Sequence, residues 1–212
     1  MARDMKYLLF EPKTPVESPL PLIVFLQGSG ERGNDVQKVK IHGPMKQAEQ
    51  ETDFPFMILS PLCPKGTWWV IGEVVELIDD IIVRYPVDED RIYLTGISMG
   101  GYGTWDLAAK HPEKFAAIVP ICGGGDPNTA GSLSPLPIWV FHGAEDPTVP
   151  VRNSDVMVEA LKKAGNDVQY TVYLKVAHDS WTQTYENPRL YEWLLKHRRH
   201  TDPGPFHHFP NV

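Results

Sequence analysis

The chain has 212 residues, 42% of them hydrophobic and 22% charged, a balance typical of a globular protein with a sizeable buried core. Its formal net charge of −7 disfavours nucleic acid and anionic membranes as partners, because both would repel it. No apolar run approaches the roughly 20 residues that span a bilayer, and residues 1–10 lack the apolar core of a signal peptide. We therefore expect a cytoplasmic protein, with a removed secretion signal as the open alternative.

Alternating strand-like and helix-like segments run along the chain. Most of the strand-like segments are continuously apolar, which indicates strands buried on both faces. Strands are expected at 7–10, 22–26, 56–59, 92–95, 116–120, 138–141 and 169–174. Helices are expected at 73–84, 101–110, 153–164 and 188–197, with Gly165 as a C-cap. This alternation predicts one α/β domain over residues 1–200, with a mostly parallel sheet covered by helices on both faces, and a tail at 201–212 that is extended or disordered.

The two cysteines, Cys63 and Cys122, each follow an apolar strand-like run. Two cysteines do not make a disulfide framework, so we expect both to be buried, reduced packing residues, and a disulfide between them is the less favoured alternative. His207 and His208 are too few and too isolated for a metal site. We expect neither a metal nor an organic cofactor, and the sequence leaves the oligomeric state open.

A G-x-S-x-G pentapeptide, Gly-Ile-Ser-Met-Gly at 96–100, lies between the strand-like run 91–95 and a helix-like run. A tight strand-to-helix turn of this kind strains the backbone of the serine and exposes its hydroxyl group. The flanking glycines are needed because side chains there would collide where strand and helix nearly touch. By chance the pattern arises in roughly one such chain in twenty, so Ser98 as a nucleophile depends on partners elsewhere.

Candidate partners lie on loops after later strands, where parallel sheets present their catalytic groups. The loop 142–150 offers Asp146, and the loop 176–181 offers His178. We predict that His178 accepts the proton of Ser98 and that Asp146 holds the other ring nitrogen of the imidazole. The chain order Ser, Asp, His differs from the orders in chymotrypsin and subtilisin.

Other residues compete for the acid and base roles. His142 is close to Asp146, but only four residues separate them on one loop. Glu145 is the nearest rival acid. Asp126 is better explained as a turn residue, because Asp-Pro favours turns, and His111 is better explained as a helix cap. We therefore retain Ser98, Asp146 and His178.

The tetrahedral oxyanion of an acyl transfer needs preorganised N–H donors. We predict the backbone N–H of Met99 as one donor and that of Ser29, in the glycine-rich loop 27–33, as the other. A phosphate-binding role for this loop is disfavoured, because no Gly-Lys-Ser/Thr follows. Gln27 and Trp181 are predicted to shape the substrate cleft, and simple packing is an equally good explanation for Trp181.

The surroundings of the cleft are predicted from two further features. Trp68, Trp69 and Trp105 are expected to be core or rim aromatic residues rather than ligand platforms. About sixteen residues separate the strand ending near 121 from the one starting at 138, which is too few for a helical lid. We therefore expect an open cleft.

These motifs resemble those of the α/β-hydrolase superfamily over residues 7–196. Within it, Gly-Ser-Gly-Glu-Arg-Gly, Thr-Gly-Ile-Ser-Met-Gly-Gly-Tyr-Gly-Thr-Trp, Ile-Cys-Gly-Gly-Gly and Phe-His-Gly-Ala-Glu-Asp-Pro-Thr-Val-Pro are similar to small lidless bacterial esterases. These are variously called phospholipase/carboxylesterase-like, feruloyl-esterase-like or "predicted peptidase" proteins. The resemblance implies an α/β-hydrolase fold without a lid domain, and a triad of Ser98, Asp146 and His178. Gln27 replaces the histidine usual in relatives, which bears on loop anchoring and acyl preference.

The expected function is therefore hydrolysis of carboxylic esters by a serine carboxylesterase through an acyl-enzyme. The expected substrates are small-molecule esters with short-chain or aryl acyl groups, such as acetyl or feruloyl esters, and this step rests on analogy. Two alternatives remain, a serine peptidase or amidase of the same fold and a non-catalytic binding protein that retains the fold.

Overall fold

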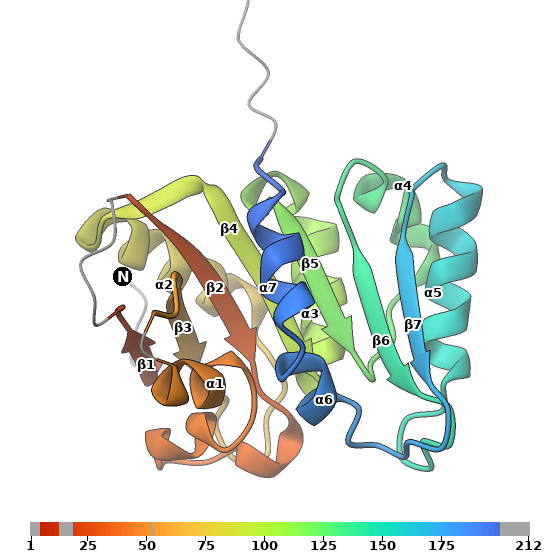
Figure 1. Ribbon diagram of the computed structural model, residues 1–212, viewed down its shortest axis with the longest axis horizontal. Coiled ribbons are helices and arrows are strands. Elements are labelled where there is room, and N and C mark those ends of the chain that lie inside the picture. The colour runs from red at the N-terminus through yellow and green to blue at the C-terminus, as the bar shows by residue number, and fades with distance from the viewer. Residues whose placement is uncertain (1–4, 13–18, 52, 200–212) are drawn as a thin grey trace, which may run out of the picture.

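The computed structural model describes residues 5–12, 19–51 and 53–199, and its centre is a sheet of seven strands (Figure 1). The strand order is β1-β3-β2-β4-β5-β6-β7; β1 is antiparallel to β3, and the other neighbouring strands are parallel. The strands are β1 Tyr7–Phe10, β2 Leu20–Leu26, β3 Met57–Pro61, β4 Val87–Ile97, β5 Ala117–Ile121, β6 Trp139–Gly143 and β7 Gln169–Tyr173. Each expected strand is present, and the predicted α/β class is confirmed. The tail predicted at 201–212 lies outside the described residues.

The strand β2 shows how the sheet is buried on both faces. Leu22, Val24 and Leu26 pack into one hydrophobic cluster, and Ile23 and Phe25 pack into a second cluster. Because successive side chains of a strand point to opposite faces, the two clusters lie on opposite sides of the sheet. All five side chains are at most 1% exposed, which explains why this strand is continuously apolar in the sequence.

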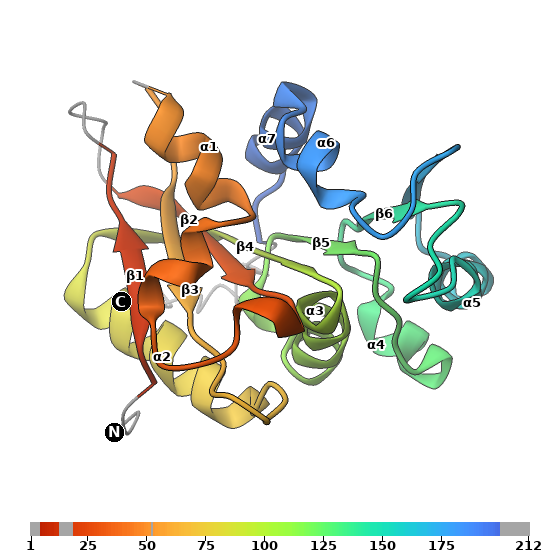
Figure 2. The same cartoon turned by 90° about the horizontal axis from the view of Figure 1, so that it is seen from below.

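Helices cover both faces of the sheet. They are α1 Pro44–Gln50, α2 Ile71–Arg84, α3 Met99–Lys110, α4 Ala130–Leu133, α5 Arg152–Lys163, α6 Trp181–Tyr185 and α7 Pro188–Leu195. Figure 2 shows α1, α6 and α7 on one side of the strands and α2, α3 and α4 on the other. The four helices expected from the sequence are present, and Gly165 follows α5 with a φ of +85°. Among the described helices, none is both long and apolar enough to cross a membrane.

The helices α1, α4 and α6 were not expected from the sequence. They have 7, 4 and 5 residues, too few to display a helical hydrophobic repeat. Between β5 and β6 the chain forms only the 3-10 turn Pro127–Thr129 and α4. The predicted absence of a lid in this connection is therefore confirmed.

The parallel strands end at a common edge, the lower edge of the sheet in Figure 1. The loops that follow β2, β4, β6 and β7 carry the residues predicted to be functional. This topology therefore brings four segments that are distant in the sequence to one end of the molecule.

Candidate active site

Ser98 occupies the sharp turn between β4 and α3. Its φ of +52° and ψ of −115° are strained for a residue with a side chain. A Cβ atom on Gly100 would lie 1.8 Å from the carbonyl oxygen of Leu26, and one on Gly96 would lie 2.3 Å from that of Gly100. Only glycines therefore allow β2, β4 and α3 to approach closely enough to form this turn.

The side chains of Ser98, His178 and Asp146 form a continuous chain of hydrogen bonds. His178 Nε2 lies 3.0 Å from Ser98 Oγ, and His178 Nδ1 lies 2.7 Å from Asp146 Oδ2. A carboxylate can only accept, so Nδ1–H donates to Asp146 and Nε2 is left to accept the serine hydroxyl proton. The structure thus brings together the three residues predicted from three separate loops.

Asp146 is held by donors on both carboxylate oxygens. Its side chain is 0% exposed, and Oδ1 accepts the backbone N–H groups of Thr148 and Val149 at 2.8 and 2.9 Å. Burial acts to raise the pKa of Asp146, but hydrogen bonds from His178, Val149 and Thr148 outweigh it and hold the pKa below its usual value. The carboxylate is therefore ionised at neutral pH and can stabilise a charged imidazole.

His142 lies behind this carboxylate and is fully buried. Its Nε2 lies 2.8 Å from the carbonyl oxygen of Val149 and 3.3 Å from Asp146 Oδ2, and its Nδ1 lies 2.7 Å from Ser154 Oγ. Because a carbonyl can only accept, Nε2–H is the donor and Nδ1 accepts from Ser154. Burial lowers the pKa of His142, so its ring is neutral and supports the acid loop. The structure places His178, and not His142, beside Ser98.

The other candidates for the acid and base roles lie where they cannot act on Ser98 through His178. Glu145 is exposed, whereas its neighbour Asp146 bonds to His178. Asp126 accepts the N–H of Asn128 at the start of a 3-10 turn, in agreement with the turn prediction. His111 occupies the C-cap position of α3, as expected.

The two predicted oxyanion donors are each the first residue of a helix. Met99 is the first residue of α3, and Ser29 is the first residue of the 3-10 helix Ser29–Glu31. The first N–H groups of a helix have no acceptor within that helix, and the helix dipole makes them attractive to an anion. Ser29, Ser98 and Met99 line one cavity of about 250 Å³, as the predicted oxyanion site requires.

Four further residues line this cavity: Arg32, Trp68, Tyr102 and Val149. Trp68 was expected as a core or rim aromatic residue, and the other three were not predicted from the sequence. Arg32 donates from Nε to the carbonyl oxygen of Ser29 at 3.1 Å and from Nη1 to that of Thr67 at 2.8 Å. It therefore ties the glycine-rich loop to the loop that carries Trp68. Tyr102 could have been found by spacing, because it lies four residues after Ser98 and hence on the same face of α3.

Gln27 and Trp181, the two residues predicted to shape the cleft, occupy different environments. The side chain of Gln27 is 1% exposed and does not line the cavity, contrary to its predicted role, because it directly follows the buried strand β2. Trp181 packs edge-on against His178, with ring centroids 5.2 Å apart, and its indole N–H donates to His42 at 3.2 Å. Trp181 thus packs beside the imidazole that bonds to Ser98.

Cys63 and Cys122 are both buried and form no disulfide, as predicted. Cys122 lies beneath the triad, where its sulfur, a carboxylate oxygen of Asp146 and a ring nitrogen of His178 lie within 4.8 Å of one another. Burial raises the pKa of the Cys122 thiol to about 12, so it stays protonated at neutral pH. A protonated thiol is a poor metal ligand, and the other two groups already bond to each other.

Comparisons with known proteins agree with this fold. The family model described as phospholipase/carboxylesterase matches residues 65–193. A bifunctional acetylxylan esterase/xylanase of Neocallimastix patriciarum is 38% identical over 85 residues, which are 39% of this chain and 12% of that protein. A probable feruloyl esterase C of Aspergillus oryzae is 28% identical over 153 residues, or 69% of this chain and 57% of that protein.

A crystal structure of a thermostable esterase superposes with a TM-score of 0.80 at 38% identity, over 91% of this chain and 59% of that one. The chain therefore spans less than two thirds of the length of these relatives. The matched segment includes β4, α3 and the loops that carry Asp146 and His178. The chain belongs to the phospholipase/carboxylesterase family of the α/β-hydrolase superfamily.

Proposed function

We propose that the protein is a serine hydrolase of carboxylic esters that acts through an acyl-enzyme. The observation that carries this proposal is the hydrogen-bond chain from Asp146 through His178 to Ser98. In the first step His178 Nε2 takes the hydroxyl proton while Ser98 Oγ attacks the ester carbonyl carbon. The negative charge that develops on the carbonyl oxygen is stabilised by the N–H groups of Met99 and Ser29.

The second half of the reaction uses the same groups. His178 gives its proton to the alcohol oxygen, the C–O bond breaks, and the acyl group remains on Ser98. A water molecule then transfers a proton to His178 and attacks the acyl carbon, and collapse of the intermediate returns the proton to Ser98. Asp146 keeps the imidazole in the required tautomer and stabilises its charged form.

Short-chain and aryl esters are the proposed substrates. The catalytic cavity is small, about 250 Å³, and the connection between β5 and β6 forms no lid. The names of the relatives include an acetylxylan esterase and feruloyl esterases, and they refer to an acetyl and an aryl acyl group respectively. Both observations favour soluble esters over emulsified fat as substrates.

The test is hydrolysis of p-nitrophenyl esters from acetate to octanoate, and of methyl ferulate, by the wild type and by Ser98→Ala. Loss of the nucleophile is expected to lower kcat on the order of a millionfold. Ser132→Ala changes an exposed serine outside the cavity and serves as the matched control. Undiminished hydrolysis by Ser98→Ala would refute the mechanism. A matching amide cleaved as fast as its ester would instead favour the peptidase alternative.

A further inference from the structure

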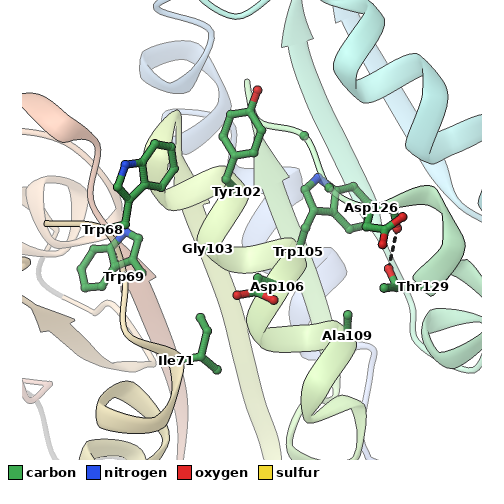
Figure 3. Close-up of a pocket in the computed structure, with 12 residues that line it drawn as sticks. Trp68, Trp69, Ile71, Tyr102, Gly103, Trp105, Asp106, Ala109, Asp126 and Thr129 are labelled. Carbon is green, nitrogen blue, oxygen red and sulfur yellow. Dashed lines mark hydrogen bonds between the residues drawn. The ribbon is translucent and has the colours of Figure 1, made fainter.

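A second cavity, of about 320 Å³, lies along α3, and Figure 3 shows the residues that line it. The two cavities share Trp68 and Tyr102 as walls. The second cavity is closed on one side by the start of α2 and on the other by the segment after β5, and it contains none of the triad residues. It is therefore an extension of the candidate active site with no part in the proposed chemistry.

The distance from Ser98 to the second cavity can be measured along α3, because residues of this helix line the cavity. Its lining residues on α3 include Tyr102, Trp105, Asp106 and Ala109, which share one helical face. They follow Ser98 by 4 to 11 residues, and at a rise of about 1.5 Å per residue the cavity extends from roughly 6 to roughly 16 Å along the helix. An acetyl group bound to Ser98 cannot reach it. Its occupant must belong to a larger substrate.

The walls of the second cavity are aromatic. Trp68 is 61% exposed and stands edge-on to Tyr102, with ring centroids 6.1 Å apart. Trp69 and Trp105 are buried behind them, and in the part of the chain described their indole nitrogens have no hydrogen-bond partner. Both indole nitrogens are themselves buried, so a ligand in the cavity meets the rings of these residues and not their N–H groups. A ligand with a flat apolar face fits such walls.

The polar groups of the second cavity are spread along its length. Asp106 is fixed by an ion pair with Lys110 at 2.8 Å, and Asp126 is fixed by two hydrogen bonds from Asn128 at 2.9 Å. Figure 3 shows Trp68 and Asp126 at opposite ends of the labelled set, with Asp106 between them. No lysine, arginine or histidine is among the described lining residues. The carboxylates therefore favour a neutral ligand with several hydroxyl donors over an anionic one.

We propose that this second cavity binds the sugar units of a neutral glycan whose ester group lies at Ser98. A sugar ring has an apolar face that stacks on an indole such as Trp68, and a rim of hydroxyls that donate to carboxylates such as Asp106. The inference rests on the proposed ester hydrolysis and adds the class of alcohol that the enzyme deacylates.

The test compares two acetyl esters, p-nitrophenyl acetate and an O-acetylated β-1,4-xylo-oligosaccharide. Ala109→Leu fills the far end of the second cavity, and Asp106→Asn removes a carboxylate acceptor. Each is expected to lower kcat/KM for the oligosaccharide relative to p-nitrophenyl acetate by about tenfold. The matched controls are Ala160→Leu, a partly buried alanine of α5, and Asp80→Asn, which is ion-paired to Arg84 on α2. Neither lines the second cavity, and both are expected to keep the wild-type ratio.

An unchanged ratio in both cavity variants would overturn the inference and leave ester hydrolysis standing. So would a wild type that cleaves p-nitrophenyl acetate but not the oligosaccharide. If the variants instead lower hydrolysis of methyl ferulate relative to methyl acetate, the occupant is the acyl group and the glycan assignment is wrong.

A binding experiment separates this inference from the proposed function. The unacetylated xylo-oligosaccharide is titrated into Ser98→Ala while tryptophan fluorescence is recorded, so no turnover is needed. Saturable binding that Ala109→Leu weakens and Ala160→Leu retains supports the glycan site even if esters prove to be the wrong substrates. Absence of saturable binding contradicts it even if esters are hydrolysed.

Discussion

The acid side and the oxyanion side of the candidate active site differ in how completely their buried polar groups are paired. On the acid side, His142 and Asp146 are buried and every polar side-chain atom of both has a partner. On the oxyanion side, Gln27 is equally buried, but neither its oxygen nor its nitrogen has a hydrogen-bond partner within the described residues. The acid loop is thus fixed by its own network, whereas the oxyanion loop is tied at its surface by Arg32.

On the acid side, the largest loss of activity is expected from Asp146→Asn. An amide of the same shape can present N–H to His178 and stabilise the wrong tautomer, so kcat is expected to fall about ten-thousandfold with little change in fold. The measurement is steady-state kinetics on p-nitrophenyl acetate together with a circular dichroism spectrum. Glu145→Gln, at the exposed neighbouring position, is the control. If that change proves the more damaging of the two, Asp146 is not the orienting acid.

His142→Leu tests the network behind the carboxylate. It leaves the carbonyl of Val149 without its buried donor, whereas the hydroxyl of Ser154 can still donate to the carbonyl of Gly123 at 3.3 Å, and the expected cost is about 1–3 kcal/mol of unfolding free energy. Urea unfolding of the wild type and of the variant measures this cost. His142→Gln, which keeps a donor and an acceptor, is expected to recover part of it. Equal losses in the two variants would mean that packing, and not hydrogen bonding, is the role of this side chain.

Because the folded protein keeps His142 neutral, its free energy of unfolding is expected to depend on pH. Burial lowers its pKa from 6.5 in the folded state, so the unfolded chain binds the extra proton first as the pH falls. The wild type is therefore expected to have this contribution in full above about pH 6.5 and to lose stability as the pH falls from there toward the folded pKa. The difference in unfolding free energy between pH 7.5 and 5.5 is expected to be smaller in His142→Gln. A difference equal to that of the wild type would assign the pH dependence to other groups.

Arg32→Lys tests how the oxyanion side is held. Lysine keeps the charge but has one nitrogen in place of the two that bond the carbonyls of Ser29 and Thr67, so it cannot reproduce that geometry and the loop of Ser29 is expected to lose its fixed position. The expected effect is a fall in kcat of about tenfold, below the hundredfold or more typical of losing a donor outright. Arg152→Lys, at an exposed ion pair on α5, is the control. A change in KM alone would mean that Arg32 contacts substrate rather than positioning the loop.

The sequence predicted the acid side more completely than the oxyanion side, and the physical reason is local. The loops of Asp146 and His178 follow the parallel strands β6 and β7, so topology alone brings their side chains to one edge. Arg32 and Trp68 belong to two loops that meet through Arg32 and through a backbone hydrogen bond from Gly33 to Cys63, and nothing in the spacing of either loop indicates those contacts. The short helices α1, α4 and α6 were missed for a related reason, because tertiary packing rather than a helical repeat determines them.

The sequence predicted a cleft role for Gln27 that the structure does not support. The effect expected from changing this residue is the smallest in size and opposite in sign to the others. Relatives are expected to have a histidine there, and the structure places the glutamine amide in the core rather than in the cleft. A buried amide without partners loses its hydration and gains no hydrogen bond, so the apolar side chain of similar shape in Gln27→Met is expected to raise stability by about 1 kcal/mol. Urea unfolding measures the gain, and kcat on p-nitrophenyl acetate is the readout for the loop. His142→Leu is expected to lower the free energy of unfolding, and Gln27→Met is expected to raise it. Opposite changes would show that the two loops differ in whether their buried polar groups are hydrogen-bonded. A loss of stability in Gln27→Met would mean that its amide is bonded in solution, and the contrast between the two loops would fail.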